Sequence, residues 1–141
     1  MPDQNEFENL LTNRNLKRTK TRILVLEVLK DSSPKTVDEI FSTLYQNHMK
    51  LSLSTVYRVL DSFVERNIVN KLSIITDNRA LYEYNSMVHR HYLVCLGCKK
   101  IMPIEHCPLE DYEKALSKET GYSIVRHKLH IYGYCPACKD N

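Results

Sequence analysis

The first half of the chain carries the hydrophobic spacing of amphipathic helices. A short helix is expected over residues 7–11 and a second over residues 20–30, where Thr19 stands at the capping position. Thr36 and Glu39 have the spacing of a capping box, a side-chain acceptor three residues before a returning carboxylate. This pair predicts that a third helix begins there.

The fourth predicted helix has the clearest pattern. After Ser52, apolar residues recur at the spacing of one helix face, at Val56, Val59, Leu60, Phe63 and Val64. Two runs rich in β-branched and aromatic residues follow at 68–75 and 79–84, and the polar triplet 76–78 between them predicts a turn. Helices followed by a hairpin are the order of a winged helix, so we expect a winged-helix domain over residues 1–85.

The second half of the chain differs in pattern and in chemistry. It alternates short strand-like runs with one amphipathic segment at 109–119, and a closing strand is expected over 123–132. All five cysteines and five of the six histidines lie in this half. We therefore expect an α+β protein in which residues 86–141 form a separate α/β domain built around bound metal.

Length and composition narrow the class of protein. A chain of 141 residues suffices for one ordinary domain or two small ones. It has neither an apolar run near the length of a membrane span nor a secretory signal pattern, so we expect a soluble, cytoplasmic protein with no membrane partner. In a reducing cytoplasm, five cysteines point to metal or redox chemistry rather than to disulfide bonds.

Two Cys-x-x-Cys pairs, Cys95 with Cys98 and Cys135 with Cys138, are the strongest local signal. Four thiolates in two knuckles suit a closed, structural tetrahedral zinc site. The alternative is a pair of redox-active dithiols, the arrangement of a thiol oxidoreductase, which would hold no zinc. Cys107 is the odd cysteine, and its type and position leave open a ligand, a redox group or a small buried residue.

A second group offers nitrogen and oxygen ligands. His89 and His91 share a face of a predicted strand, Glu110 lies on the amphipathic segment, and His127 lies on the expected closing strand. Imidazoles with one carboxylate suit zinc, and also iron or manganese. Such a ligand set exchanges its ion more readily than four thiolates do, which is what metal sensing requires.

The N-terminal half also has the features of a DNA-binding surface. A winged helix inserts the start of its last helix into the major groove, and four residues there fall off the apolar stripe: Ser54, Thr55, Tyr57 and Arg58. Arg58 suits a guanine or a phosphate. No acidic residue lies between Glu8 and Glu27, and the basic residues in that interval suit phosphates, among them Lys17, Arg18 and Arg22.

Two plainer interpretations remain open for this surface. A charge run is often only a solvated helix face. A winged-helix protein stabilised by bound zinc can also serve as a protein-interaction module that does not bind DNA.

These motifs together resemble the ferric uptake regulator family along nearly the whole chain. The segments that carry the resemblance are 16–19 with Arg22, 54–60, 89–91, Cys95 with Cys98, 121–122, His127 and 131–138. The resemblance implies a metal-dependent repressor, not an enzyme, that binds a palindromic operator on double-stranded DNA as a homodimer. It also implies that the C-terminal domain dimerises and that the four paired cysteines hold a structural zinc.

The resemblance further assigns a regulatory metal site. The positions of His89, His91, Glu110 and His127 match a four-ligand site of the family, and Glu83 matches one ligand of a second site at the hinge. Other hinge positions depart from the family pattern: Arg90 and Tyr92 replace histidines, and Pro34 and Pro103 replace further ligands. Residues 104–108 are similar to the zinc-uptake regulator branch, which favours zinc as the sensed ion, with iron(II) as the alternative and manganese also compatible.

Overall fold

The chain folds into two compact units, residues 1–86 and residues 87–141. The computed structural model describes residues 4–30, 33–47, 49–73, 80–86 and 90–140. Each unit has a three-stranded sheet of its own, and helices accompany both, so the predicted α+β class is confirmed. Within the described ranges, no helix combines the length and the apolar composition needed to cross a membrane.

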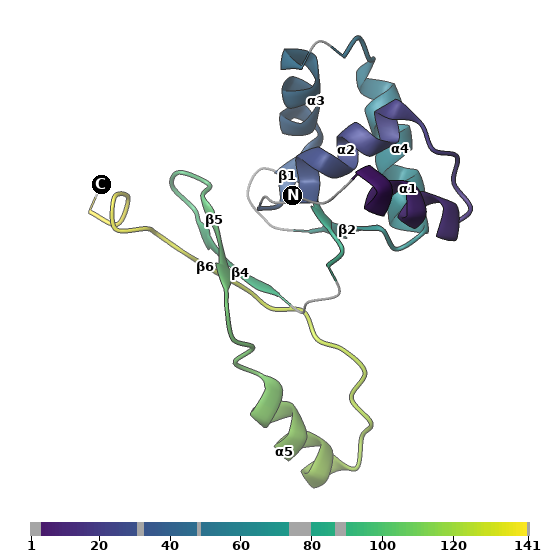
Figure 1. The fold of residues 1–141 in the computed structure, drawn as a ribbon. Helices are drawn as coiled ribbons and strands as arrows, with labels where there is room; N and C mark the ends of the chain where they lie inside the picture. The colour runs from purple at the N-terminus through teal and green to yellow at the C-terminus, as the bar shows by residue number, and fades with distance from the viewer. Residues whose placement is uncertain (1–3, 31–32, 48, 74–79, 87–89, 141) are drawn as a thin grey trace. The chain divides into compact units, whose positions relative to one another are not determined.

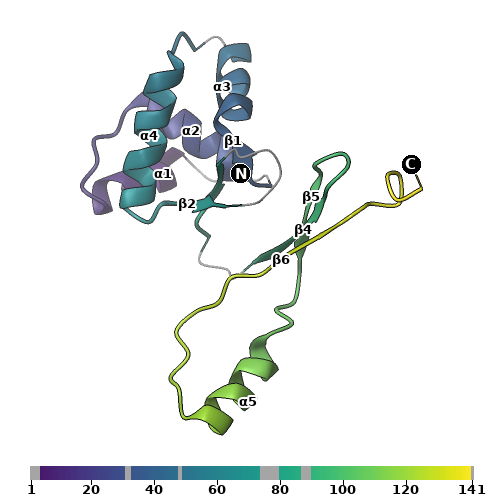
Figure 2. The same ribbon diagram turned by 180° about the vertical axis from the view of Figure 1, so that it is seen from behind.

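The N-terminal unit is a helical cluster with a small sheet (Figures 1 and 2). Its elements are α1 (Gln4–Asn13), α2 (Lys20–Lys30), β1 (Lys35–Thr36), α3 (Val37–Gln46), α4 (Leu53–Glu65), β2 (Val69–Leu72) and β3 (Leu81–Tyr84). The strands pair antiparallel in the order β1-β3-β2. The predicted winged helix is therefore present, although the predicted turn at 76–78 lies outside the described residues.

Side-chain caps set the starts of α3 and α4. The Thr36 hydroxyl accepts a hydrogen bond from the Glu39 N–H at 3.2 Å, as the capping-box spacing predicts. The Ser52 hydroxyl does the same for the Thr55 N–H, also at 3.2 Å. The cap at Ser52 fixes where α4 begins and therefore which side chains stand on its first turn.

The apolar stripe of α4 lies in the core of this unit. Val56, Leu60 and Phe63 are fully buried, and they pack with buried residues of the other helices and of the sheet, including Phe7, Leu11, Leu26, Ile40 and Tyr82. Because one face of α4 is held inward by this packing, the opposite face must point to solvent.

The C-terminal unit is built on a central strand, β4 (His91–Cys95). Strand β5 (Ile101–Ile104) pairs with it antiparallel on one side, and β6 (His130–Gly133) pairs with it parallel on the other. Helix α5 (Glu110–Thr120) lies between β5 and β6 in sequence (Figure 1). It ends at Gly121, whose φ of 77° is a left-handed conformation that favours glycine.

The closing strand is shorter than its sequence pattern predicts. The pattern indicated a strand over 123–132, but β6 begins only at His130, and His127 lies in irregular chain before it. The partner strand explains the difference, since β4 begins at His91 and the first ladder pair joins Tyr92 to His130. In this register Leu129 stands opposite His91, the first residue of β4, so residues before Leu129, including His127, lie beyond the end of the strand and cannot continue its hydrogen-bonded ladder.

Candidate metal centres and polar helix surface

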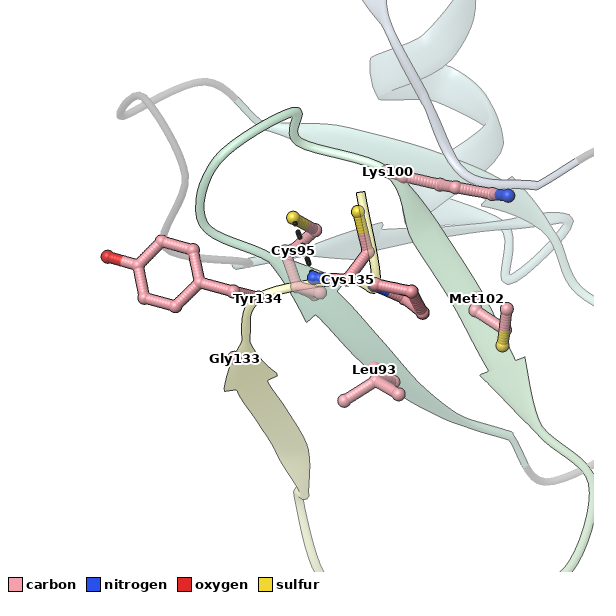
Figure 3. Close-up of a pocket in the computed structure, with 9 residues that line it drawn as sticks. Leu93, Cys95, Lys100, Met102, Gly133, Tyr134 and Cys135 are labelled. Carbon is pink, nitrogen blue, oxygen red and sulfur yellow. Dashed lines mark hydrogen bonds between the residues drawn. The ribbon is translucent and has the colours of Figure 1, made fainter. Parts of the chain in front are cut away.

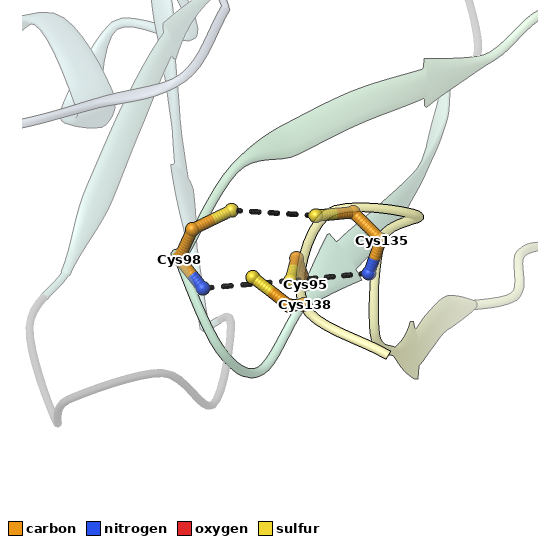
Figure 4. Close-up of side chains that lie close together, drawn as sticks. All are labelled: Cys95, Cys98, Cys135 and Cys138. Atoms are coloured by element: carbon orange, nitrogen blue, oxygen red, sulfur yellow. Dashed lines mark hydrogen bonds between the residues drawn. The ribbon is translucent and has the colours of Figure 1, made fainter. Parts of the chain in front are cut away.

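Two tight turns bring the four paired cysteines together (Figure 4). The sulfur atoms of Cys95, Cys98, Cys135 and Cys138 all lie within 4.8 Å of one another, and those of Cys98 and Cys135 are 3.8 Å apart. Tetrahedral zinc with Zn–S bonds of about 2.3 Å separates its sulfurs by about 3.8 Å. The four side chains therefore fit a single tetrahedral ion, with two ligands from each knuckle.

Backbone amides favour ionisation of one of these thiols. The N–H groups of Cys135 and Cys98 donate to the Cys95 sulfur at 3.3 and 3.5 Å, and they lower the pKa of the Cys95 thiol to about 6. Hydrogen bonds to the neighbouring sulfurs of Cys135 and Cys95 instead raise the pKa of Cys138 to about 12. One thiolate thus forms readily at neutral pH, whereas four together need a cation to offset their charge.

Gly97 allows the first knuckle to pack against the second. A Cβ atom at this position would lie 2.9 Å from both the Cβ and the Sγ of Cys138, so any side chain would displace a candidate ligand. The turn then continues through Lys99, whose N–H donates to the Cys95 carbonyl at 3.0 Å. Gly97 was not among the residues predicted from the sequence, although a glycine between the two cysteines of a knuckle is a signal that could have identified it.

A second cluster lies at the other end of β4. The Nε2 atoms of His91 and His127 are 2.9 Å apart, and the Cys107 sulfur lies 3.2 Å from the first and 3.4 Å from the second. His91 is 2% exposed, and the other two side chains are half-buried. Three ligand atoms of metal-binding type therefore converge on one point.

Neighbouring oxygen atoms orient both imidazoles. Nδ1 of His127 contacts a carboxylate oxygen of Glu113, and Nδ1 of His91 lies 3.3 Å from the Leu129 carbonyl. An ionised carboxylate and a carbonyl only accept hydrogen bonds, so each Nδ1 carries the hydrogen. Each Nε2 then presents its lone pair to the cluster, which is the form in which histidine binds a metal ion.

The structure brings part of the predicted regulatory ligand set together. His91 and His127 meet, whereas His89 lies outside the described residues. The Glu110 side chain is 71% exposed and lies 3.6 Å from the Lys114 ammonium. Glu113, one helical turn further along α5, is the carboxylate at His127, and it was not among the residues predicted from the sequence.

The position expected to contribute to a hinge site lies in the N-terminal unit. Glu83 is half-buried on β3, and the Asn70 side-chain amide donates to its carboxylate at 3.4 Å. In the C-terminal unit, Tyr92 is buried on β4 opposite Pro103 of β5, and Arg90 is exposed. The structure thus gives Tyr92 a packing role in the sheet.

The first turns of α4 form a polar surface on the N-terminal unit. Ser54, Tyr57 and Arg58 are exposed, and Thr55 is half-buried with its hydroxyl 2.9 Å from that of Ser52. These are the side chains that the apolar stripe was expected to leave facing outward.

The basic residues before α2 are also on the surface. Lys17 and Arg18 are exposed in the loop between α1 and α2, and Arg18 lies 3.5 Å from the Glu8 carboxylate. The Arg22 guanidinium donates to the Lys17 carbonyl at 2.8 Å, which ties the loop to the start of α2.

An exposed apolar row crosses the C-terminal sheet. Met102, Leu93 and Ile131 stand directly opposite one another on β5, β4 and β6, so they share one face, and they are 50%, 41% and 44% exposed. A pocket of about 180 Å³ lies beside this row and extends to Cys135 (Figure 3). Three adjacent apolar side chains on an open sheet face form a surface that a partner could cover.

Comparisons with a family model, with a related protein and with solved structures all point to the same family. The ferric uptake regulator family model matches residues 13–132. The ferric uptake regulation protein of Cupriavidus metallidurans is 29% identical, over 96% of this chain and 92% of that protein. The solved structure of the Vibrio cholerae ferric uptake regulator has a TM-score of 0.81 at 27% identity, covering 91% of this chain and 98% of that one. The Francisella tularensis regulator, solved with iron, has a TM-score of 0.78 at 28% identity, covering 88% and 95%.

The packing at Gly97 gives a direct test of the cysteine site. We expect Gly97→Ala to weaken zinc retention roughly tenfold against a competing chelator, because the added methyl group must push Cys138 away. Gly133→Ala is the matched control, since a Cβ atom there meets nothing within 4 Å. Equal zinc retention by the two variants, measured by elemental analysis after chelator dialysis, would contradict the assigned packing.

Proposed function

The chain belongs to the ferric uptake regulator family, and from this premise we propose that it is a DNA-binding transcriptional repressor, not an enzyme, that senses zinc and controls metal-uptake genes. The observation that carries the proposal is the pairing of two clusters with different ligand chemistry on one strand. Four thiolates form a closed site that holds zinc tightly, whereas imidazoles with fewer protein ligands suit an ion that exchanges with its supply.

The candidates for regulatory ligands come from positions that match the family, and the distances in the structure decide which of them we favour. Family position offers His89, His91, Glu110 and His127 as candidates, with Glu83 as a possible additional ligand, and the proposal keeps the candidates that the structure brings into the cluster. The 2.9 Å approach of the two Nε2 atoms supports His91 and His127 in this role. Iron(II) is the alternative effector, because curated relatives are named ferric uptake regulation proteins and one similar structure was solved with iron.

The proposed DNA contacts come from α4 and the basic loop before α2. Arg58, with Ser54, Thr55 and Tyr57, stands at the outward start of α4, where a winged helix meets base edges. Lys17, Arg18 and Arg22 would contact phosphates, which position the protein on the duplex without reading its sequence.

The proposed assembly is a homodimer through the C-terminal sheet. The exposed row of Met102, Leu93 and Ile131 supports this, since a second copy would remove all three side chains from water. Two identical winged helices then require a palindromic operator with half-sites about 34 Å, or one helical turn, apart.

The proposed switch is a shift between conformations of the C-terminal unit. Ligation by His91 and His127 joins the start of β4 to the irregular chain before β6, and Glu113 extends the connection to α5. Residues held in this way favour one arrangement of the dimer, and DNA affinity changes only to the extent that this arrangement binds the operator better.

Metal titration of operator binding tests the sensing role. We expect zinc at fixed salt to raise the affinity of the full chain for its operator, and His91→Ala to remove the response while the tightly held zinc stays bound. His106→Ala is the control, because His106 is exposed and stands outside the cluster. A response to iron(II) but not to zinc in a gel-shift assay would favour the alternative effector.

Arginine substitution tests the DNA surface. We expect Arg58→Ala to weaken operator binding by about 1–3 kcal/mol if its guanidinium reads a guanine. Arg126→Ala, an equally charged change at an exposed position in the other unit, should leave affinity nearly unchanged. Operator affinity that does not change in Arg58→Ala would instead favour a protein-interaction module.

A charge placed in the apolar row tests the dimer. We expect Leu93→Glu to shift the protein from dimer to monomer in analytical ultracentrifugation, because the interface would then bury an unpaired carboxylate. Tyr45→Glu makes a comparable change at an exposed position of the N-terminal unit and should leave the dimer intact. Dimers of equal stability in both variants would place the interface elsewhere.

A further inference from the structure

We propose that the Cys107 thiolate is itself a ligand of the regulatory ion, and that its sulfur makes this site select zinc over manganese and iron(II). In this arrangement Glu113 is a positioning residue that orients His127, and Glu110 is not a ligand. The inference rests on the proposed function only in taking the ion bound at this cluster to be the regulatory one.

The first support is the orientation of the two imidazoles, which directs both Nε2 lone pairs into the cluster. His91 and His127 each carry hydrogen on Nδ1, directed at the Leu129 carbonyl and at Glu113, so their two Nε2 lone pairs face one another at 2.9 Å. A cation at the point where the three atoms converge would have both nitrogens and the sulfur as ligands.

The second support is the spacing of the three atoms. Zinc bonds of about 2.0–2.1 Å to nitrogen and 2.3 Å to sulfur, at tetrahedral angles, separate two nitrogens by about 3.3 Å and a nitrogen from a sulfur by about 3.6 Å. The observed separations of 2.9, 3.2 and 3.4 Å are each within about 0.4 Å of these values. Three ligands also leave a fourth tetrahedral position for an exchangeable group.

The third support is the placement of the two glutamates of α5. Glu110 and Glu113 are three residues apart and so lie near one face of the helix. Glu110 is 71% exposed and contacts Lys114, whereas Glu113 is 25% exposed and contacts His127 Nδ1. The carboxylate nearest the cluster therefore lies behind an imidazole, and the Cys107 sulfur takes the position of a direct ligand.

Sulfur in place of carboxylate oxygen changes which ion binds best. Thiolate is a soft ligand that favours zinc, whereas carboxylates suit manganese, and manganese is the weakest binder of the divalent series. The Cys107 S–H bond breaks as the metal–sulfur bond forms, and its proton passes to solvent.

Cobalt(II) is a spectroscopic probe of the proposed sulfur ligand. We expect one equivalent of cobalt(II), added to the full chain with its tightly held zinc in place, to give a sulfur-to-cobalt charge-transfer band in the near ultraviolet. The band should disappear in Cys107→Ser and persist in His106→Ala. Bound cobalt without this band in the unaltered protein would overturn the proposal, as would an equal band in a Cys107→Ser protein that elemental analysis shows to have kept its tightly held zinc.

The two glutamates give a matched pair of variants. We expect Glu113→Gln to weaken zinc binding 10–100-fold while the cobalt band remains, which is the effect of losing a group that orients a ligand. Glu110→Gln should leave zinc affinity unchanged. The opposite result, with affinity lost only in Glu110→Gln, would overturn the assignment of both residues.

Selectivity is measured without DNA, so the two proposals fail separately. Cys107→Asp should lower the ratio of zinc to manganese affinity at least tenfold, and an unchanged ratio would contradict the role given to sulfur. If the cobalt band depends on Cys107 but zinc does not alter operator binding, the proposed function fails and the ligand assignment stands. If zinc controls operator binding equally well in Cys107→Ser, the assignment of Cys107 as a ligand fails and the proposed function stands.

Discussion

The parallel pairing of β6 with β4 is the constraint on which both side-chain clusters depend. Its register sets Cys95 opposite Gly133, which brings the second knuckle to the first, and sets Tyr92 opposite His130, which brings the chain carrying His127 to His91. At about 3.3 Å per residue, the two ends of this five-residue strand are about 13 Å apart. One ladder of hydrogen bonds therefore positions two groups of candidate ligands with different chemistry.

The two groups differ in what they require of an ion. Each cysteine knuckle contributes two sulfurs on a short turn. Hydrogen bonds to the sulfurs of Cys135 and Cys95 raise the pKa of Cys138, so a nearby cation is needed to ionise all four thiols together. The residues of the cluster at His91 come instead from three separate segments. His91 is at the start of β4, Cys107 lies in the link before α5, and His127 lies in the irregular chain before β6. In the proposed switch, an ion bound there would connect parts of the chain that backbone pairing leaves apart, which is a suitable basis for a conformational response.

Sequence could predict the features that depend on local spacing. The cap at Thr36, the buried stripe of α4 and the two knuckles follow from residues a few positions apart, and the structure contains all of them. Sequence could not decide between Glu110 and Glu113, because residues three apart share a helix face and only tertiary packing chooses between them. Cys107 was undecided for the same reason. The expected strand through His127 failed because the length of a strand depends on where its partner begins.

The three residues between His91 and Cys95 also restrict how this fold can change over evolution. An insertion there would turn one cluster to the other face of the sheet while the second stayed in place, because side chains alternate along a strand. The chain that leads from α5 to β6 is under no such restriction, since its length can vary as long as one imidazole still reaches His91. Insertions and deletions should therefore be tolerated in the chain after α5 and selected against within β4. The number of residues from His91 to Cys95 should stay constant as related sequences diverge.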